Sequence, residues 1–408
     1  MKSVLFSVLA LCMAFGVAAK ERKAVYIVTD GIPADYIERV HPRTIFDIAS
    51  RGGYCRAYTG GEIGAYSQTP TISAVGYTNI LTGTWVNKHN VPGNDNLKPR
   101  YQYRSLFRTA KEQRRPVTTA LASSWVDNRT VLIGEGKPET GNLKIDYVFD
   151  GYENDKTRFP DREDQTHIFA IDSLVALNAA ECIRDKAPDL TWVYLWFTDS
   201  GFHLHGDGAY MDRYVHKTDS LVAMVWDAVK YREKNFDEEW MIVVTTDHGR
   251  DERGFGHGGQ SARERSTWIA VNRPEVNSQF SEPALSLVDI NPTICRFLGF
   301  EDPQEVEFEK DGVPFIGRAD ISGLKSGKYD DNIVLTWDTY GNPDCDAEVF
   351  VAFSNKYLEG GHDEWVKAGS VPAKAGKFVF DKKRYPASKF YKFVVRTPAN
   401  HLNRWYAE

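Results

Sequence analysis

The chain has 408 residues, of which 42% are hydrophobic and 26% charged, and its formal net charge is -6. This composition is typical of a globular protein long enough for a large core and two domains. The acidic balance argues against a nucleic-acid-binding surface, which is normally basic. Small anionic partners are still possible, because a bound metal ion inverts the local sign of the charge.

The first 19 residues have the pattern of a signal peptide. Lys2 gives a positive start, the apolar stretch that follows is too short to span a bilayer, and small residues precede an expected cleavage after Ala19. Cys12 would also permit a lipid anchor, but the bulky Leu11 before it disfavours this alternative. No later apolar run reaches 18 residues, about the shortest length that suggests a membrane span. We therefore expect an exported protein, periplasmic or extracellular, without a membrane span.

Residues 20–317 alternate between strand and helix patterns. We expect strands at residues 25–28, 117–122, 146–149, 192–197, 240–245 and 268–271. We expect helices at residues 37–50, 168–187 and 210–231, and a last helix that opens at Val288. Strands separated by helices of this length predict an α/β domain with a mostly parallel sheet covered by helices on both faces.

The pattern changes over residues 318–408. Short runs rich in β-branched and aromatic residues are separated by Gly, Pro, Asn and Asp. These runs lie at residues 333–337, 347–354, 365–369, 377–380 and 390–397. They predict a small C-terminal antiparallel β-sandwich. Trp337 on an early strand and Tyr391 on a late one give it a loose resemblance to a fibronectin type III-like module.

Four cysteines follow the expected cleavage site: Cys55, Cys182, Cys295 and Cys345. They show neither close pairing nor the spacing of a zinc finger. An exported location permits disulfides, and isolated buried thiols are the alternative.

Three of the expected strands each end in a carboxylate, and imidazoles follow two of them. The residues are Asp30 after the first strand, Asp199 and His203 after the fourth, and Asp247 and His248 after the fifth, with His257 nine residues beyond His248. Ligands gather at the carboxyl ends of strands in open α/β sheets. Carboxylates and imidazoles are zinc ligands, and paired metal ions stabilise an in-line displacement at phosphorus. We therefore predict a two-metal site formed by these six residues.

Taken singly, each candidate ligand has an ordinary structural interpretation, such as a turn Asp, a surface His or a flexible glycine loop around His257. A tight turn at Gly201 is expected to bring Asp199 and His203 together. His205 is a rival ligand, but its spacing from Asp199 is less suitable. The combination of the six residues carries the prediction, because three strand-end carboxylates with imidazole partners seldom coincide.

The best place for a nucleophile is the segment of residues 68–83, which we interpret as a loop entering a helix at about Ser73. At a helix N-terminus, backbone N–H groups point at the anion that a hydroxyl attacks. A nearby metal ion would lower the pKa of that hydroxyl. A plain N-cap is the alternative role for Ser73, and Thr69 and Thr71 are competing hydroxyls.

Together these motifs resemble the alkaline phosphatase superfamily, and within it the type I phosphodiesterase or nucleotide pyrophosphatase-like branch, over residues 20–317. The resemblance implies that Asp30, Asp247 and His248 hold one metal ion, and that Asp199, His203 and His257 hold the other. In the family the nucleophile stands nine residues before the Thr of a Thr-Gly pair. Counting back from Thr82 gives Ser73, which favours the nucleophile over the N-cap. The resemblance implies a structural role for His89.

The chain departs from that branch at several positions. The branch usually has a Thr nucleophile, with an Asn three residues later that holds a phosphate oxygen, whereas this chain has Ser73 and Gly76. Alkaline phosphatases proper are closer to this chain here. Other residues must then bind the non-bridging oxygens, and the candidates are Asn79, Asn94 and Arg250.

The resemblance implies an exported phosphoric ester hydrolase that works through a phospho-enzyme on Ser73. Its cofactors would be two divalent metal ions, for which mixed His and carboxylate ligands favour zinc. Its expected substrate is a small phosphate ester or diester. The alternatives are a phosphomonoesterase, a sulfatase and a non-catalytic glycan-binding protein. A sulfatase is disfavoured because residues 73–77 lack the Pro and Arg of the usual sulfatase motif.

Overall fold

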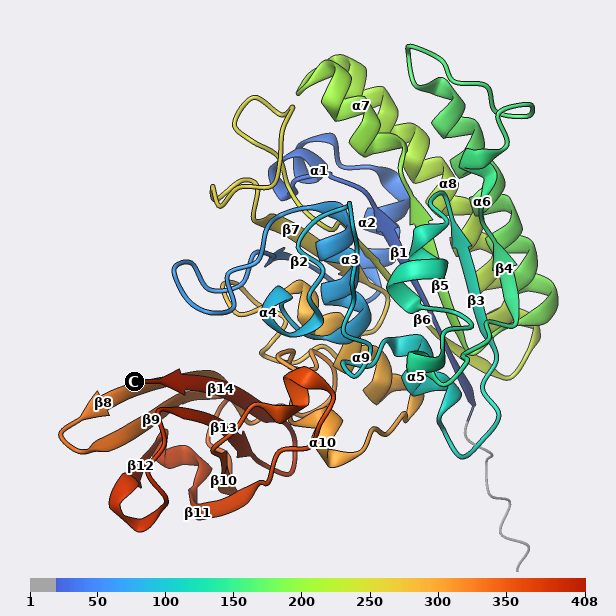
Figure 1. The fold of residues 1–408 in the computed structure, drawn as a ribbon. Helices are drawn as coiled ribbons and strands as arrows, with labels where there is room; N and C mark the ends of the chain where they lie inside the picture. The colour runs from blue at the N-terminus through green and yellow to red at the C-terminus, as the bar shows by residue number, and fades with distance from the viewer. Residues whose placement is uncertain (1–19) are drawn as a thin grey trace, which may run out of the picture.

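The computed structural model describes residues 20–408 (Figure 1). The expected signal peptide and Cys12 lie outside this part of the chain. A seven-stranded sheet, counted over the described residues, has the order β2-β7-β6-β1-β5-β3-β4. Its strands are β1 (Glu21–Thr29), β2 (Gly53–Tyr58), β3 (Thr119–Ser123), β4 (Tyr147–Phe149), β5 (Leu190–Leu195), β6 (Glu238–Thr245) and β7 (Ser266–Val271).

The central strands of this sheet are parallel, which confirms the prediction of a mostly parallel sheet. β1 pairs in parallel with β5 and β6, and β3 pairs in parallel with β5 and β4. β7 is antiparallel to β6 and β2. We did not predict β2. Its side chains are mostly half-buried, as expected of an edge strand, so its sequence has no continuous apolar run.

Alternate residues of β1 face two separate cores, because successive side chains of a strand point to opposite faces. Val25 and Ile27 belong to one core, and Tyr26 and Val28 belong to the other. The first core is covered by α1 (Ala34–Val40), α2 (Arg43–Ser50), α6 (Thr166–Lys186) and α8 (Ala209–Asn235). The second is covered by α3 (Ser73–Thr82), α5 (Leu106–Lys111) and α9 (Ile290–Leu298). Figure 1 shows the long α6 and α8 on one side of the sheet and α3 and α9 on the other.

The single helix expected over residues 37–50 is wrong: α1 and α2 are separate, because His41 has a left-handed φ of 51° and Pro42 then begins α2. α6 is the only described helix whose length and composition would allow it to cross a membrane. Half of its most apolar window is buried within the protein, and it packs against α8 and β5 as a core helix.

Shorter segments connect these elements. The short α-helices are α4 (Val86–His89), α7 (Phe197–His205) and α10 (Gln304–Glu307). Single turns of other helix types are η1 (Asn128–Ile133), η2 (Pro138–Thr140), η3 (Tyr152–Asn154), η4 (Leu287–Asp289), η5 (Lys356–Glu359), η6 (Ala373–Ala375) and η7 (Lys382–Arg384).

The C-terminal region forms two antiparallel sheets, of order β11-β10-β13-β14 and β12-β9-β8. Their strands are β8 (Ile321–Tyr329), β9 (Asn332–Thr339), β10 (Asp346–Ala352), β11 (Val366–Pro372), β12 (Lys377–Asp381), β13 (Phe390–Arg396) and β14 (His401–Ala407). Trp337, Val349 and Phe393 lie in the apolar core of this region. Five strands occur where we expected them, and β8 and β14 are additional. The domain boundary at residue 317 and the fibronectin type III-like assignment stay predictions.

The four cysteines of the described chain are free. Cys182 and Cys295 are buried, whereas Cys55 and Cys345 are half-buried. Of the two alternatives that the sequence left open, the structure therefore has isolated thiols.

Candidate active site

The three candidate carboxylates lie beside one another because β6, β1 and β5 are neighbours in the sheet. Asp30 directly follows β1, and Asp247 lies just beyond the end of β6. Asp199 lies in α7, which begins two residues after β5. These three strands run parallel, so their carboxyl ends meet at one edge of the sheet. The topology thus brings together residues that are far apart in the sequence.

Asp30, Asp247 and His248 form a group that we call the first cluster. His248 Nε2 lies 3.4 Å from Asp30 Oδ1 and 3.3 Å from Asp247 Oδ2. Ser73 Oγ lies 3.1 Å from the same nitrogen. The three cluster residues are fully buried, and Ser73 is 7% exposed. Two carboxylates, an imidazole and a hydroxyl therefore converge on one point.

Neighbouring groups satisfy the outer oxygens of the first cluster. Asp30 Oδ2 accepts hydrogen bonds from the hydroxyls of Tyr77 and of Tyr194, the latter at 2.7 Å. Asp247 Oδ1 accepts a bond of 3.0 Å from the N–H of Gly31. The inner oxygens, Asp30 Oδ1 and Asp247 Oδ2, are buried without a partner among the described residues. Buried carboxylate oxygens without a protein partner fit the coordination of a cation.

Backbone carbonyls orient two of the imidazoles. His248 Nδ1 lies 2.9 Å from Gly249 O, and His257 Nδ1 lies 2.9 Å from Thr71 O. Each Nδ1 is therefore protonated and donates a hydrogen bond to the carbonyl. Each Nε2 then presents a lone pair to the clusters. A backbone carbonyl that fixes the tautomer in this way is characteristic of metal-ligating histidines.

The electrostatics of the first cluster also fit a divalent ion. Burial raises the pKa of Asp30, and the charges of Asp247 and Asp199 raise it further. Burial raises the pKa of Asp247 to about 7 and lowers that of His248. The protein alone thus disfavours both ionised carboxylates, whereas a bound cation would restore their charged forms.

Asp199, His203 and His257 form a second cluster. His203 Nε2 lies 3.2 Å from His257 Nε2 and 3.4 Å from Asp199 Oδ1. His257 Nε2 lies 3.7 Å from the same oxygen. The side chain of His203 is 47% exposed, so this cluster opens to solvent. The two clusters adjoin, because the rings of His248 and His257 stack with centroids 3.8 Å apart.

A helix, and not the expected glycine turn, brings Asp199 and His203 together. Both lie in α7 four residues apart, which places them on one helix face. Gly201 is inside this helix, and a Cβ there would lie 2.5 Å from the Tyr214 ring and 2.8 Å from Met211 Sδ. The prediction of a turn is therefore wrong. Gly201 instead allows close packing of α7 against α8.

Ser73 is the first residue of α3, and Ile72 occupies the N-cap position. No side-chain capping bond is present at this helix, and the Ser73 hydroxyl faces the first cluster. The structure thus does not support the N-cap alternative. Gly76 lies one turn later, and a Cβ there would lie 2.7 Å from both Cβ and O of Asp247. A larger side chain at position 76 would therefore clash with Asp247.

The rival residues are engaged elsewhere. The Thr71 hydroxyl donates to a backbone carbonyl of the loop that carries His257, at 2.9 Å. The Thr69 hydroxyl donates to a carbonyl two residues earlier, at 2.8 Å. The His205 ring packs against Tyr210 with centroids 3.9 Å apart, and its buried Nε2 makes no hydrogen bond within the described chain. Among the hydroxyls considered, Ser73 is the one bonded to a cluster residue.

The three substrate-binding candidates lie in different environments. Asn94 is exposed, and its Oδ1 accepts a 2.9 Å bond from the N–H of Ala74, next to Ser73. Asn79 is fully buried, with Oδ1 at 2.9 Å from His89 Nε2 and Nδ2 at 3.4 Å from Thr59 Oγ1. Both ends of the Asn79 amide bond to the protein, and its substrate-binding role stays a prediction.

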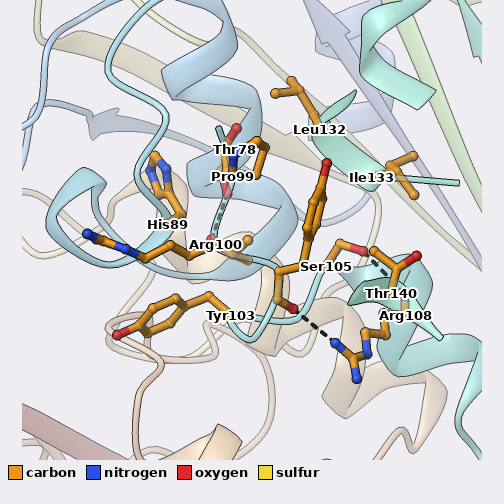
Figure 2. A pocket seen from close by; sticks show the side chains of 12 residues that line it. Thr78, His89, Pro99, Arg100, Tyr103, Ser105, Arg108, Leu132, Ile133 and Thr140 are labelled. Carbon is orange, nitrogen blue, oxygen red and sulfur yellow. Dashed lines mark hydrogen bonds between the residues drawn. The ribbon is translucent and has the colours of Figure 1, made fainter. Parts of the chain in front are cut away.

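A small cavity lies beside His89 and Thr78 (Figure 2). Its volume is about 10 Å³, which is room for roughly one water molecule. Arg100 and Tyr103 also line it, but neither Ser73 nor any candidate metal ligand does. This cavity is therefore separate from the candidate active site.

Arg250, the third substrate-binding candidate, is 0% exposed and bonds to protein groups. Its Nε donates to Gly31 O at 3.0 Å, and its Nη1 lies 3.3 Å from Phe255 O and 3.4 Å from His203 Nε2. Its Nη2 donates to Asp199 Oδ1 and, at 3.2 Å, to Asp199 O. The guanidinium is enclosed by these groups, and direct contact between Arg250 and a substrate stays a prediction.

Arg250 changes the electrostatics of the second cluster. Burial opposes ionisation of Asp199, yet the guanidinium and His203 hold the pKa of that carboxyl below its usual range. The second cluster therefore has the donor types of a metal site, but its only carboxylate is already paired with a protein cation.

The sequence did not reveal the tyrosines that hold Asp30. Tyr194 stands inside the apolar run of β5, and Tyr77 stands within α3. A tyrosine in a buried strand needs a hydrogen-bond partner for its hydroxyl. A tyrosine in a buried strand was thus the one sign in the sequence of a buried hydrogen bond, but it does not identify Asp30 as the partner.

A family model described as type I phosphodiesterase / nucleotide pyrophosphatase matches residues 24–307. The match covers more than two thirds of the chain and contains both clusters and Ser73. A search among curated proteins found no match.

Several solved structures resemble the chain distantly. Human ectonucleotide pyrophosphatase/phosphodiesterase 5 is 14% identical over 72% of this chain and 97% of that chain, with a TM-score of 0.47. The 2-O GAG sulfatase BT1596 is 12% identical over 90% and 86%, with a TM-score of 0.49. Phosphonoacetate hydrolase from Sinorhizobium meliloti 1021 is 16% identical over 56% and 57%, with a TM-score of 0.39. These similarities are too distant to support an argument about activity.

Proposed function

Because the chain belongs to the type I phosphodiesterase / nucleotide pyrophosphatase family, we propose that it is an exported, metal-dependent phosphodiesterase or nucleotide pyrophosphatase with Ser73 as nucleophile. Membership confirms the resemblance stated from the sequence, and it makes the chain a hydrolase of phosphoester bonds. The observation that carries the proposal is the position of Ser73 Oγ. It lies 3.1 Å from His248 Nε2, beside two buried carboxylate oxygens that lack a partner in the described chain.

The first cluster would hold one divalent ion, and the second cluster supplies the donors for another. Mixed imidazole and carboxylate donors favour zinc. A bound ion at the first cluster would lower the pKa of the serine hydroxyl and neutralise charge on the phosphoryl oxygens.

The residues of the chain account for a two-step reaction. Ser73 Oγ attacks phosphorus in line and forms a serine-bound phosphodiester as the P–O bond to the first alcohol or phosphate product breaks, and that product leaves with the proton of the serine hydroxyl. Water then attacks this phosphorus, its hydroxyl stays on the second product, and its other proton restores the Ser73 hydroxyl. The N-terminus of α3 adds partial positive charge where the phosphoryl group binds.

Of the three substrate-binding candidates, Asn94 is the one whose amide nitrogen has no protein partner in the described structure, and we propose that it contacts a non-bridging oxygen. Its Oδ1 is held by Ala74 N–H, and its Nδ2 makes no hydrogen bond to another described residue. This amide would donate to the phosphoryl group beside Ser73. The proposed substrate is a small phosphodiester or a nucleotide pyrophosphate.

Replacement of Ser73 tests the proposal. Ser73→Ala should retain metal but lose nearly all hydrolysis of bis-p-nitrophenyl phosphate, and a chelator should inactivate the wild type. Ser50→Ala, an exposed serine on α2, is the matched control and should keep full activity. Full activity of Ser73→Ala would reject this nucleophile. Faster turnover of p-nitrophenyl phosphate than of the diester would favour a phosphomonoesterase.

A further inference from the structure

The second cluster contains a protein cation, whereas no arginine or lysine bonds to the first cluster within the described chain. Arg250 Nη2 bonds to Asp199 Oδ1, the oxygen that also faces His203 and His257. Arg250 Nη1 lies 3.4 Å from His203 Nε2. The guanidinium thus contacts two of the three atoms that a metal ion in this cluster would need.

The protein is built around this guanidinium. Its carbon lies 5.2 Å from the centroid of the Phe202 ring, and carbonyls of Gly31 and Phe255 accept from it. Gly31 has a φ of +69°, and a Cβ at that position would lie 2.2 Å from Arg250 Nη2. A glycine is therefore needed for the guanidinium to fit. Arg250 is therefore held in the site by packing and hydrogen bonds, unlike a mobile surface side chain.

The charge balance of the two clusters differs accordingly. The first cluster brings two carboxylates and no cation, so it attracts a divalent ion strongly. The second cluster brings one carboxylate, whose charge Arg250 already neutralises. A divalent ion that shared Asp199 Oδ1 with the guanidinium would be repelled by it, because Arg250 and Asp199 are both buried and water screens their charges little.

We propose that Arg250 is the resident cation of the second cluster, so that the protein binds one divalent ion tightly at the first cluster and a second only weakly. This inference rests on the proposed metal dependence but not on the identity of the nucleophile or substrate. Arg250 is then a positioning residue that holds Asp199 and His203 without metal.

Metal content tests the proposal directly. The full chain is stripped with chelator, reloaded with zinc, passed through gel filtration, and analysed for zinc per chain and by calorimetric titration. The wild type should retain one equivalent, and any second ion should bind about 100-fold more weakly, as expected for repulsion between neighbouring cations. Arg250→Met should retain a second equivalent. Two equally tight ions in the wild type, or one retained ion in folded Arg250→Met, would overturn the proposal.

His203→Ala keeps the test decisive if Arg250→Met does not fold. His203 is half-exposed, so its loss should be tolerated. The variant should keep the single retained zinc, whereas Asp247→Asn should lose it. Loss of a retained equivalent in His203→Ala contradicts the proposal. Repeating the titration with Ser73→Ala separates the inference about Arg250 from the proposed function. The zinc content of this variant should equal that of the wild type even if Ser73 is not the nucleophile.

Discussion

The first and second clusters contain the same two kinds of side chain, carboxylates and imidazoles, but they differ in which carboxylate oxygens already have a protein partner. In the first cluster, protein donors satisfy only the outer oxygens, and the inner oxygens of Asp30 and Asp247 have no partner in the described structure. In the second, Arg250 is bonded to Asp199. Two clusters with the same residue types thus differ in whether a carboxylate oxygen is left for a cation to bind.

The clusters also differ in how they are supported. The carboxylates of the first lie at the ends of adjacent strands, β1 and β6. The second combines a helix, α7, with the loop that carries His257. Thr71 ties that loop to the start of α3, since its hydroxyl accepts from Gly258 N–H at 2.9 Å. The second cluster is therefore assembled from parts that depend on tertiary packing.

The largest expected effect comes from breaking the first cluster. Asp247→Asn should lower kcat/KM by about 1,000-fold or more, because loss of a buried anionic ligand removes electrostatic stabilisation of the reacting phosphoryl group. His203→Ala should lower it far less, since the second cluster keeps its protein cation. The measurement is diester hydrolysis at saturating zinc. Equal losses in the two variants would end the distinction between the clusters.

The fit of Arg250 gives the next prediction. Gly31→Ala should reduce the free energy of unfolding by about 3 kcal/mol or more, because the methyl group meets the guanidinium and the backbone has a positive φ. Gly64→Ala is the control: its φ is +75° and a Cβ there meets nothing within 4 Å. It should lose only about 1 kcal/mol. Urea denaturation measures both, and a similar loss in the two variants would argue against a tightly fitted guanidinium.

The hydroxyls that hold Asp30 predict a smaller effect. Tyr194→Phe should weaken zinc binding at the first cluster by about 10-fold to 100-fold, as is usual when a ligand loses its supporting hydrogen bond. Tyr26→Phe is the matched control, because the Tyr26 hydroxyl is buried without a partner among the described residues. Its removal should leave zinc affinity unchanged. Calorimetric titration compares the two, and unchanged affinity in Tyr194→Phe would contradict the supporting role.

The parts of the site that the sequence predicted are those fixed by local patterns. An apolar run followed by Asp30 or Asp247 specifies a strand end, and strand ends of a parallel sheet meet. Gly201 misled the prediction because its role depends on the partner helix, which a local pattern does not contain. Arg250 follows a glycine in a loop, and nothing local shows that it turns inward. The inward direction requires space beside Gly31, which comes from a distant strand.

The smallest expected effect concerns a buried imidazole outside both clusters. Burial lowers the pKa of His89 to about 3, so the imidazole is neutral in the folded protein above that pH. In the unfolded chain the same imidazole has its ordinary pKa of about 6.5. The neutral imidazole therefore contributes its whole stabilisation above about pH 6.5, and this contribution decreases as the pH falls below that value. The stability difference between wild type and His89→Gln should therefore narrow by about 1 kcal/mol per pH unit between about pH 6 and pH 4. Urea denaturation across that range measures it, and a constant difference would mean that His89 takes up a proton in the folded protein.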